Sequence, residues 1–233
     1  MITIIAEYLE SFRSLLFPNL CMSCSGVLSK NEKVICIICE NTLPKTNFHL
    51  THENVIFNRL YGRIPIESAT VLFYFDKGNK VQHLMHLLKY NGKKEIGVHL
   101  GKMLGKDLAE SNNFKDISTV IPVPLHEKKL RKRGYNQSEY FAKGIAEAMK
   151  ISVATNILKR IENTDTQTGK NRFERWNNVK EAFTLNDKEV LKNQHVLLVD
   201  DVVTTGATLE ACAQHLMEAE NIKVSVATIA FAH

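Results

Sequence analysis

Apolar runs and amphipathic stretches alternate along the second half of the chain. The short apolar run TVIPVP begins at Thr119, and helical periodicity follows the cap residue Asn136, with Glu139 three residues later. The run HVLLVDD is continuous and ends in two acids, which is typical of a strand buried on both faces. The same criteria predict two further strands, around 154–159 and over 223–231, and a further helix over 206–219. Strands joined by crossover helices predict a parallel sheet, and so an α/β fold.

The first half of the chain predicts fewer strands and more helices. ATVLFYF, from 69 to 75, is a strand candidate, and helices are expected over 78–90 and 94–110. Ile5, Leu9, Phe12 and Leu16 fall at helical spacing, so the N-terminal segment is expected to form an amphipathic helix that docks on the body. Residues 46–66 show no clear period and are interpreted as a connector.

Two histidines, His83 and His86, lie three residues apart on the helix expected over 78–90. This spacing is compatible with metal binding, but no acidic third ligand is evident. A surface or packing pair is therefore the favoured interpretation.

Composition narrows the class of protein only a little. A chain of 233 residues with 44% hydrophobic and 24% charged residues fits one globular domain plus a smaller module. The net charge of +5 permits an anionic ligand without requiring one. No apolar run has the length of a membrane span, and the N-terminal segment lacks a basic start and a cleavage site, so we expect a cytoplasmic protein.

Four of the five cysteines form two Cys-x-x-Cys pairs separated by a short segment. Each pair places two thiolates on one side of an ion, as in tetrahedral zinc sites, and the rival disulfide interpretation fits poorly with a chain lacking an export signal. With four thiolates and no open position, the predicted zinc is structural, in a module with a core separate from that of the rest. The predicted ligands are Cys21, Cys24, Cys36 and Cys39, whereas Cys212 is expected to be a core residue.

The stretch LLVDDVVTTGATL, from 197 to 209, carries the clearest chemistry of the sequence. In an open parallel sheet, ligands bind at the carboxyl ends of strands, where Asp200 and Asp201 are expected. Gly206 permits a tight turn, and the hydroxyl residues around it open a helix whose N–H groups can hold a phosphate. The carboxylates must then face hydrogen-bond donors or a cation, so sugar hydroxyls or magnesium are expected beside the phosphate.

This stretch resembles the phosphoribosyl-diphosphate (PRPP) signature of type I phosphoribosyltransferases. The resemblance implies that Asp200 and Asp201 hold the ribose hydroxyls, directly or through magnesium, as catalytic residues. It also implies that the following residues bind the 5-phosphate of PRPP: Val202, Thr204, Thr205, Gly206, Ala207 and Thr208.

Most of residues 15–231 is similar to the ComF family of bacterial competence proteins. The blocks that carry this resemblance are LFPNLCMSC, CIICENTLP, HLLKYNGKKEIGVHLGKMLGKDLA, VIPVPLHEKKLRKRGYNQSE and TQTGKNRFERWNNVKEAF. The family joins a zinc finger to a type I phosphoribosyltransferase-like domain, and some members are needed for uptake of transforming DNA. The implied organisation is a helix and zinc module at 1–45, a connector and hood-like region at 46–115, and the phosphoribosyltransferase-like domain at 116–233.

Two basic segments are expected near this site. HEKKLRKRGYNQ follows the strand end at Pro124 and resembles the diphosphate loop of the type I fold. Pro124 is predicted to contact PRPP, and Arg133, together with Arg131, is predicted to grip phosphate, whereas Lys128 and Lys132 are expected to be solvated. The segment 160–176 resembles the loop that closes over the ligand, and its Arg172 and Arg175 are predicted to contact PRPP. The same cations, with Tyr135, Phe173 and Trp176 as stacking surfaces, would also suit single-stranded DNA.

Two functions follow from these observations. One is a PRPP- and magnesium-binding protein of DNA uptake that engages single-stranded DNA or proteins of DNA uptake and recombination. The other is an active phosphoribosyltransferase, in which magnesium and the basic segments stabilise the leaving diphosphate. A base-recognising hood is expected from residues 1–115, because the last predicted strand ends two residues before the end of the sequence.

Overall fold

The computed structural model describes residues 17–161 and 182–232. The predicted N-terminal helix and the predicted ligand contacts Arg172 and Arg175 lie outside the described residues, as do Phe173 and Trp176.

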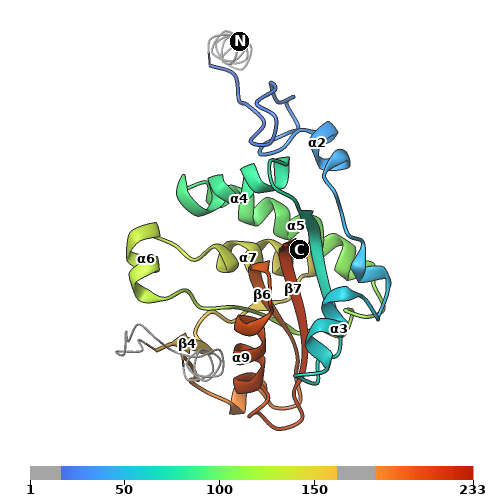
Figure 1. Ribbon diagram of the computed structural model, residues 1–233, viewed down its shortest axis with the longest axis vertical. Coiled ribbons are helices and arrows are strands. Elements are labelled where there is room, and N and C mark those ends of the chain that lie inside the picture. Colours follow the sequence, from blue (N-terminus) through green and yellow to red (C-terminus); the bar gives the residue numbers. More distant parts are fainter. Residues whose placement is uncertain (1–16, 162–181, 233) are drawn as a thin grey trace, which may run out of the picture.

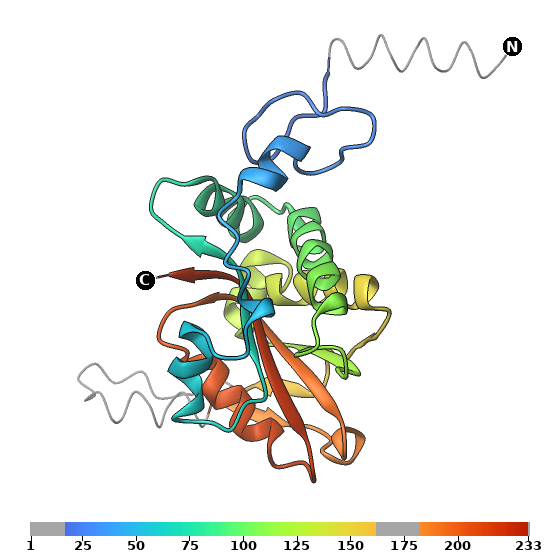
Figure 2. The same ribbon diagram turned by 90° about the vertical axis from the view of Figure 1, so that its right-hand side faces the viewer.

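A five-stranded parallel sheet forms the centre of the protein (Figures 1 and 2). Its strands, in spatial order, are β1 (Ala69–Phe75), β7 (Lys223–Ala232), β6 (His195–Val203), β2 (Thr119–Pro122) and β3 (Ser152–Val153). Every neighbouring pair in this sheet is parallel. The predicted α/β fold with a parallel sheet is therefore confirmed.

Both faces of the sheet are covered because the central strands are apolar on both sides. On β6, Leu197 and Val199 belong to one buried cluster, while Val196 and Leu198 belong to the other. This alternation is the two-residue period of a strand. One face is covered by α4 (Lys80–Tyr90), α5 (Lys94–Glu110) and α7 (Gln137–Met149), and the other by α3 (Val55–Tyr61) and α9 (Ala207–Leu216).

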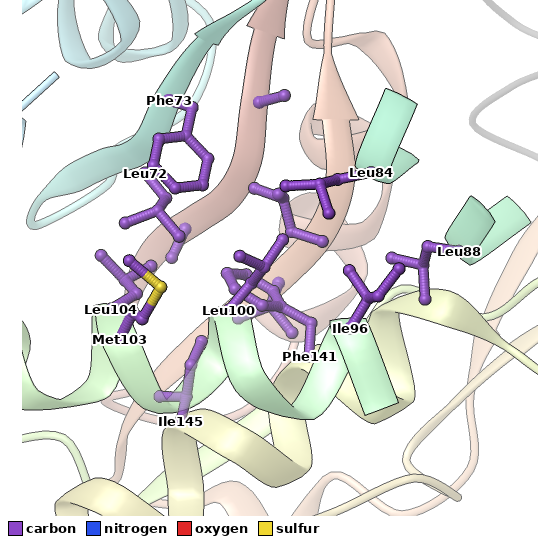
Figure 3. Close-up of a cluster of buried hydrophobic side chains, with 14 of the residues drawn as sticks. Leu72, Phe73, Leu84, Leu88, Ile96, Leu100, Met103, Leu104, Phe141 and Ile145 are labelled. Carbon is purple, nitrogen blue, oxygen red and sulfur yellow. The ribbon is translucent and has the colours of Figure 1, made fainter. Parts of the chain in front are cut away.

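Helices α5 and α7 pack together unusually closely under this sheet. Figure 3 shows Leu100 of α5 beside Phe141 and Ile145 of α7, with Leu84 and Leu88 of α4 completing the cluster. The close approach requires glycine on both helices: a Cβ on Gly101 would lie 2.2 Å from the carbonyl oxygen of Phe141. This close contact fixes the position of α7 against α5.

The segment expected to be a strand at 154–159 is mostly irregular and connects strands of two different sheets. Its predecessor β3 pairs with β2 in the main sheet, whereas β4 (Leu158–Arg160) pairs antiparallel with β5 (Phe183–Leu185) in a separate ribbon. The turn-forming Asn156 lies between them, and its carbonyl oxygen accepts a hydrogen bond from Asn186. The strand before the segment 160–176 therefore belongs to the separate ribbon and not to the main sheet.

The predicted connector contains regular structure. A 3₁₀ helix, η1 (Phe48–Leu50), is followed by α3, whose N-cap Asn54 accepts hydrogen bonds from the backbone N–H groups of Ile56 and Phe57. The buried Asn54 also donates to the carbonyl oxygen of Ala69 at 2.8 Å. This side chain fixes the start of α3 against β1.

The cysteine module is joined to the main core and does not have a separate one. Buried Cys21, Ile35 and Cys39 belong to the same cluster as Leu84 of α4 and Leu100 of α5. Figure 1 places the module, which includes α2 (Ile37–Thr42), at one end of the molecule beside α4. The expected separation of cores is thus wrong, because the apolar residues between and beside the cysteines pack onto α4 and α5.

The remaining described elements are α6 (Glu127–Arg133) and the 3₁₀ helix η2 (Glu189–Leu191). Within the ranges 17–161 and 182–232, the helices are all too short or too polar to cross a membrane.

Candidate functional site

The two predicted carboxylates lie together at the carboxyl end of β6. Both side chains are half-buried, and Oδ1 of Asp200 accepts hydrogen bonds from the backbone N–H of Asp201 at 2.8 Å and from Oγ of Ser138 at 3.0 Å. Ser138 is buried in the first turn of α7. Ser138 was not predicted as a site residue from the sequence, although its position at a helix start directly after the basic segment could have indicated a role in the site.

The two carboxylates carry more negative charge than the neighbouring Lys89 compensates. Burial, together with the charge of Asp201, raises the pKa of Asp200 to about 7, against the opposing effect of its hydrogen bonds and of Lys89. Near neutral pH the ligand-free pair therefore tends to retain a proton. A metal ion or a pair of ribose hydroxyls would supply the missing compensation.

Lys89, near the end of α4, contacts the second carboxylate. Its Nζ lies 2.9 Å from Oδ2 of Asp201, and the two side chains are only 22% and 17% exposed. Sequence reasoning missed this residue because a lysine in the last turn of a helix is usually a solvated end charge. The only signal was its position in the block HLLKYNGKK.

The predicted phosphate cradle directly follows β6. Thr204 and Thr205 are exposed, and Gly206 has φ of +82° at the N-cap of α9, where no side chain caps the helix. The backbone N–H of Ala207 donates to Oγ1 of Thr205 at 3.4 Å. Because helix starts leave N–H groups without intrahelical partners, α9 presents donors to an anion at the site of the turn.

Helix α3 holds this turn from the outside. Arg59 donates through Nη1 to the carbonyl oxygen of Thr204, and Arg63 donates through Nη2 to that of Thr205 at 2.9 Å. Arg63 also pairs with the buried Glu210 of α9 at 2.8 Å. These residues fell in the predicted connector and were not identified from the sequence, because their partners lie more than a hundred positions away.

Replacing Gly206 by Ala should disturb the turn strongly. A Cβ there would lie 2.7 Å from Cδ2 of Leu60, and the positive φ is unfavourable for an L side chain. We expect a loss of about 1–3 kcal/mol in the free energy of unfolding, measured by urea denaturation. Gly134→Ala is the matched control, because Gly134 has φ of +78° but open space around it, so only the backbone cost remains. An equal loss in both variants would contradict the contact with Leu60.

The first basic segment forms helix α6 rather than a loop. Glu127 lies in its first turn and three of its five cations, Arg131, Lys132 and Arg133, lie in its last turn, which suits the helix dipole, and Gly134 ends the helix with positive φ. Arg133 donates to Oε1 of Gln137 at 2.6 Å, and its guanidinium lies 5.4 Å from the centre of the Tyr90 ring. Arg133 lines a cavity of about 350 Å³ together with Lys89, Tyr90, Gly92, Lys129, Lys132 and Tyr135.

Two other predicted ligand contacts of this segment lie elsewhere. Arg131 is exposed and pairs with Glu127 one turn earlier at 2.9 Å. Pro124 lines a different cavity, of about 290 Å³, with Leu130 and Arg160. Tyr135 is buried, with its hydroxyl donating to the carbonyl oxygen of Leu88, so it is not the open stacking surface that was expected. Tyr90, which is 67% exposed, is the open ring beside this cavity.

The four predicted zinc ligands converge. Their Sγ atoms all lie within 4.8 Å of one another, and none of the five cysteines forms a disulfide. The Sγ atoms of Cys24 and Cys36 are 3.8 Å apart. Four thiolates about 2.3 Å from a tetrahedral ion would have a spacing of ~3.8 Å, so the cluster is compatible with a structural zinc.

Hydrogen-bond donors around the sulfur of Cys21 favour its thiolate form. The backbone N–H groups of Ser23 and Cys36 point at Sγ of Cys21, at 3.4 and 3.2 Å. Burial raises the pKa of Cys21, and the surrounding backbone donors outweigh it to bring the pKa down to about 7. Lys80, at the start of α4, places its Nζ 3.6 Å from Sγ of Cys39.

Among the described residues, the cluster of possible metal ligands consists of the four cysteines and does not include the histidine pair on α4. His83 lines a surface cavity beside Cys21 and Met22, and the His86 ring lies 5.1 Å from that of Tyr90. Surface and packing contacts of this kind agree with the favoured interpretation.

The parallel sheet, the carboxylate pair and the hydroxyl-rich helix start together define a phosphoribosyltransferase-like domain, and the model described as "Phosphoribosyl transferase domain" matches residues 136–233. The chain belongs to the ComF family: Competence protein F of Haemophilus influenzae is 35% identical over 209 residues, covering 84% of this chain and 90% of that protein.

More distant similarities are found to other proteins. The DNA utilization protein YhgH of Escherichia coli (strain K12) is 27% identical over 210 residues, covering 86% of this chain and 91% of that protein. Among solved structures, glutamine PRPP amidotransferase from B. subtilis matches with a TM-score of 0.42 and 20% identity, covering 61% of this chain and 30% of that enzyme.

Proposed function

We propose that this protein binds PRPP with magnesium at the carboxyl end of β6 and acts in DNA uptake in the cytoplasm. The observation that carries the proposal is that two carboxylates, with the pKa of Asp200 raised, lie next to a helix start that no side chain caps. Asp200 and Asp201 require donors or a cation, and α9 presents donors to an anion. A ribose 5-phosphate group has both of these chemistries in one ligand.

Each part of the site has a role in this proposal. The carboxylates accept hydrogen bonds from the two ribose hydroxyls, and residues 202 and 204–208 hold the 5-phosphate. Arg133, with the lysines around the basic cavity, faces the diphosphate, and Arg172 and Arg175 are proposed to close on it from the segment outside the described residues. Magnesium, when bound, neutralises charge between the diphosphate and the carboxylates, for which oxygen donors are the suitable ligands.

The cysteine cluster is proposed to hold one structural zinc. Its donor set is four thiolates, without an open position for substrate. The zinc would fix the loops of the module, whose buried residues continue into the core under α4 and α5.

The relatives support the role in DNA uptake. One relative is named for competence and the other for DNA utilization, and both matches extend over more than four fifths of this chain. On this basis, single-stranded DNA and proteins of DNA uptake or recombination are the proposed partners. The region 46–115 is the proposed hood.

Phosphoribosyl transfer is the alternative function. It is favoured by the match of residues 136–233 to the phosphoribosyl transferase model and by the contacts of α3 and α4 with the site. In this alternative, the helices from residues 46–115 that contact the site are proposed to flank the position where an acceptor base would enter.

Calorimetry with PRPP, with and without magnesium, tests the binding proposal. We expect binding that magnesium strengthens, and absence of heat at millimolar PRPP would contradict the site. Product analysis with labelled PRPP against a panel of bases, amines and DNA then separates the two functions. Release of diphosphate that depends on one acceptor would establish transfer.

Single-stranded DNA should compete with PRPP if both use the same cations. Trp176 is the only tryptophan, so its fluorescence reports the segment around Arg172 and Arg175. Log affinity for DNA should fall linearly with log salt, by roughly 0.7 per phosphate contacted, and Arg172→Ala with Arg175→Ala should make that slope shallower. DNA binding that leaves Trp176 emission unchanged and does not compete with PRPP would contradict a shared cleft, and the zinc module would become the next candidate surface.

A further inference from the structure

Lys89 stands between the two halves of the proposed site. Its Nζ forms the ion pair with Asp201, at 2.9 Å, and the same side chain lines the basic cavity that contains Lys129, Lys132 and Arg133. The side chain of Lys89 is only 22% exposed in this arrangement, so it is not a solvated end charge of α4.

The ion pair holds a cation at the place where a bound magnesium would bring further positive charge. The 2.9 Å contact fills one lone-pair position of the Asp201 carboxylate, and a divalent cation or a ribose hydroxyl bound at the others would weaken the attraction of this carboxylate for Lys89. A lysine has a long stem with several rotatable bonds, and its head can turn without movement of the helix. The cavity wall that it already lines provides the nearest alternative position, and an anion placed there would give the ammonium a new partner.

We propose that Lys89 is a ligand-responsive counter-ion of the site. It neutralises Asp201 in the ligand-free protein and turns to the diphosphate when a divalent cation or the ribose hydroxyls take Asp201. This inference rests on the proposed PRPP site and adds a residue that selects for ligands carrying an anion at the anomeric position. Ribose 5-phosphate lacks that anion, so for it Lys89 would leave Asp201 without gaining a partner.

The position of Lys89 is fixed by the rest of α4. Leu84, Met85 and Leu88 are buried in the core, and Lys80 contacts Cys39 at the other end of the helix. The backbone of Lys89 is therefore held in place while its head group remains free to exchange partners.

The variant Lys89→Met keeps the length of the apolar stem and removes the charge. The proposal predicts opposite effects of this variant on two ligands, tighter binding of a metal ion and weaker binding of PRPP. Without the competing ammonium, Mn²⁺ alone should bind the carboxylates at least threefold more tightly, measured by electron paramagnetic resonance. PRPP in metal-free buffer should bind at least tenfold more weakly, because one charge-assisted hydrogen bond to the diphosphate is lost.

Lys132→Met is the matched control. Lys132 lines the same cavity, and the ion pairs of the described residues do not include it. Its removal should weaken PRPP binding but leave Mn²⁺ affinity within about twofold, because separated surface charges are screened. A folded Lys89→Met protein with unchanged Mn²⁺ affinity, or with PRPP weakened only as much as in the control, would overturn the proposal.

Wild-type protein distinguishes this outcome from failure of the proposed function. If wild type binds PRPP with magnesium and Lys89→Met lacks the opposite shifts, only the role of Lys89 is wrong. If wild type does not bind PRPP at all, the site assignment itself is wrong and the role of Lys89 falls with it. If Lys89→Met fails to fold, Lys89→Gln provides the same comparison, since it also removes the charge.

Discussion

Replacing Asp200 and Asp201 together by Asn should abolish PRPP binding and leave the fold intact. Hydrogen bonds to charged groups contribute roughly 1.5–3 kcal/mol each, so loss of two such acceptors predicts a fall in affinity of at least about 100-fold. Calorimetry with PRPP and magnesium measures this directly. Asp116→Asn is the control, because Asp116 lines a cavity with residues at the amino ends of β6 and β7, the opposite end of the sheet.

The same double variant should change how stability depends on pH. The pKa of Asp200 in the folded protein is raised from 3.8 to about 7, so the folded state binds an extra proton between about pH 4 and pH 7. The free energy of unfolding of the wild type should therefore fall as pH rises through this window and level off above it. Asn at both positions removes this contribution, and the variant should be the more stable of the two at pH 8. Unchanged PRPP affinity, or a wild type that gains stability between pH 5 and pH 8 relative to the variant, would contradict these assignments.

The main features of the sheet and of its ligand-facing end could be predicted from the sequence because their signals are local. The continuous apolar run of β6, its terminal acids and the glycine before α9 lie within a few residues of one another. A strand buried on both faces and a helix start have physical requirements that neighbouring residues alone satisfy. The four cysteines have the same property, since ligand spacing along the chain reflects the geometry around one ion.

The supporting residues could not be predicted because their roles depend on partners far along the chain. Arg59 acts on the carbonyl oxygen of Thr204, 145 positions later, and Ser138 acts on Asp200, 62 positions later. An arginine in a segment without a clear hydrophobic period has no sequence pattern that separates a structural role from an ordinary surface position. Helix α6 was missed for a different reason. Its sequence resembled the diphosphate loop of the type I fold, but lysine, leucine and arginine are good helix formers, and three of the five cations lie in the last turn.

Removing zinc should weaken the PRPP site as well as the cysteine module, because the two share one core. Chelation, or Cys39→Ser at a ligand that is 1% exposed, removes an anchor of the cluster that also contains Leu84 and Leu88 of α4. It also leaves Lys80 without the thiolate that its ammonium contacts at 3.6 Å. Since α4 carries Lys89 to Asp201 at 2.9 Å, disorder at the start of this helix should reach the carboxylates.

Metal analysis, thermal unfolding and calorimetry together measure this linkage. Wild type should contain one zinc per chain, and Cys39→Ser should lower the Tm by roughly 10 °C, as expected for a loss of about 3–4 kcal/mol in a chain of this length. Its affinity for PRPP should fall about tenfold, since the charge-assisted contact of Lys89 is lost. Cys212→Ala is the control, because this buried cysteine lies outside the cluster and its loss should lower the Tm without changing zinc content. Protein that lacks zinc yet keeps full PRPP affinity would show that the module and the site are energetically independent, despite the contacts through α4.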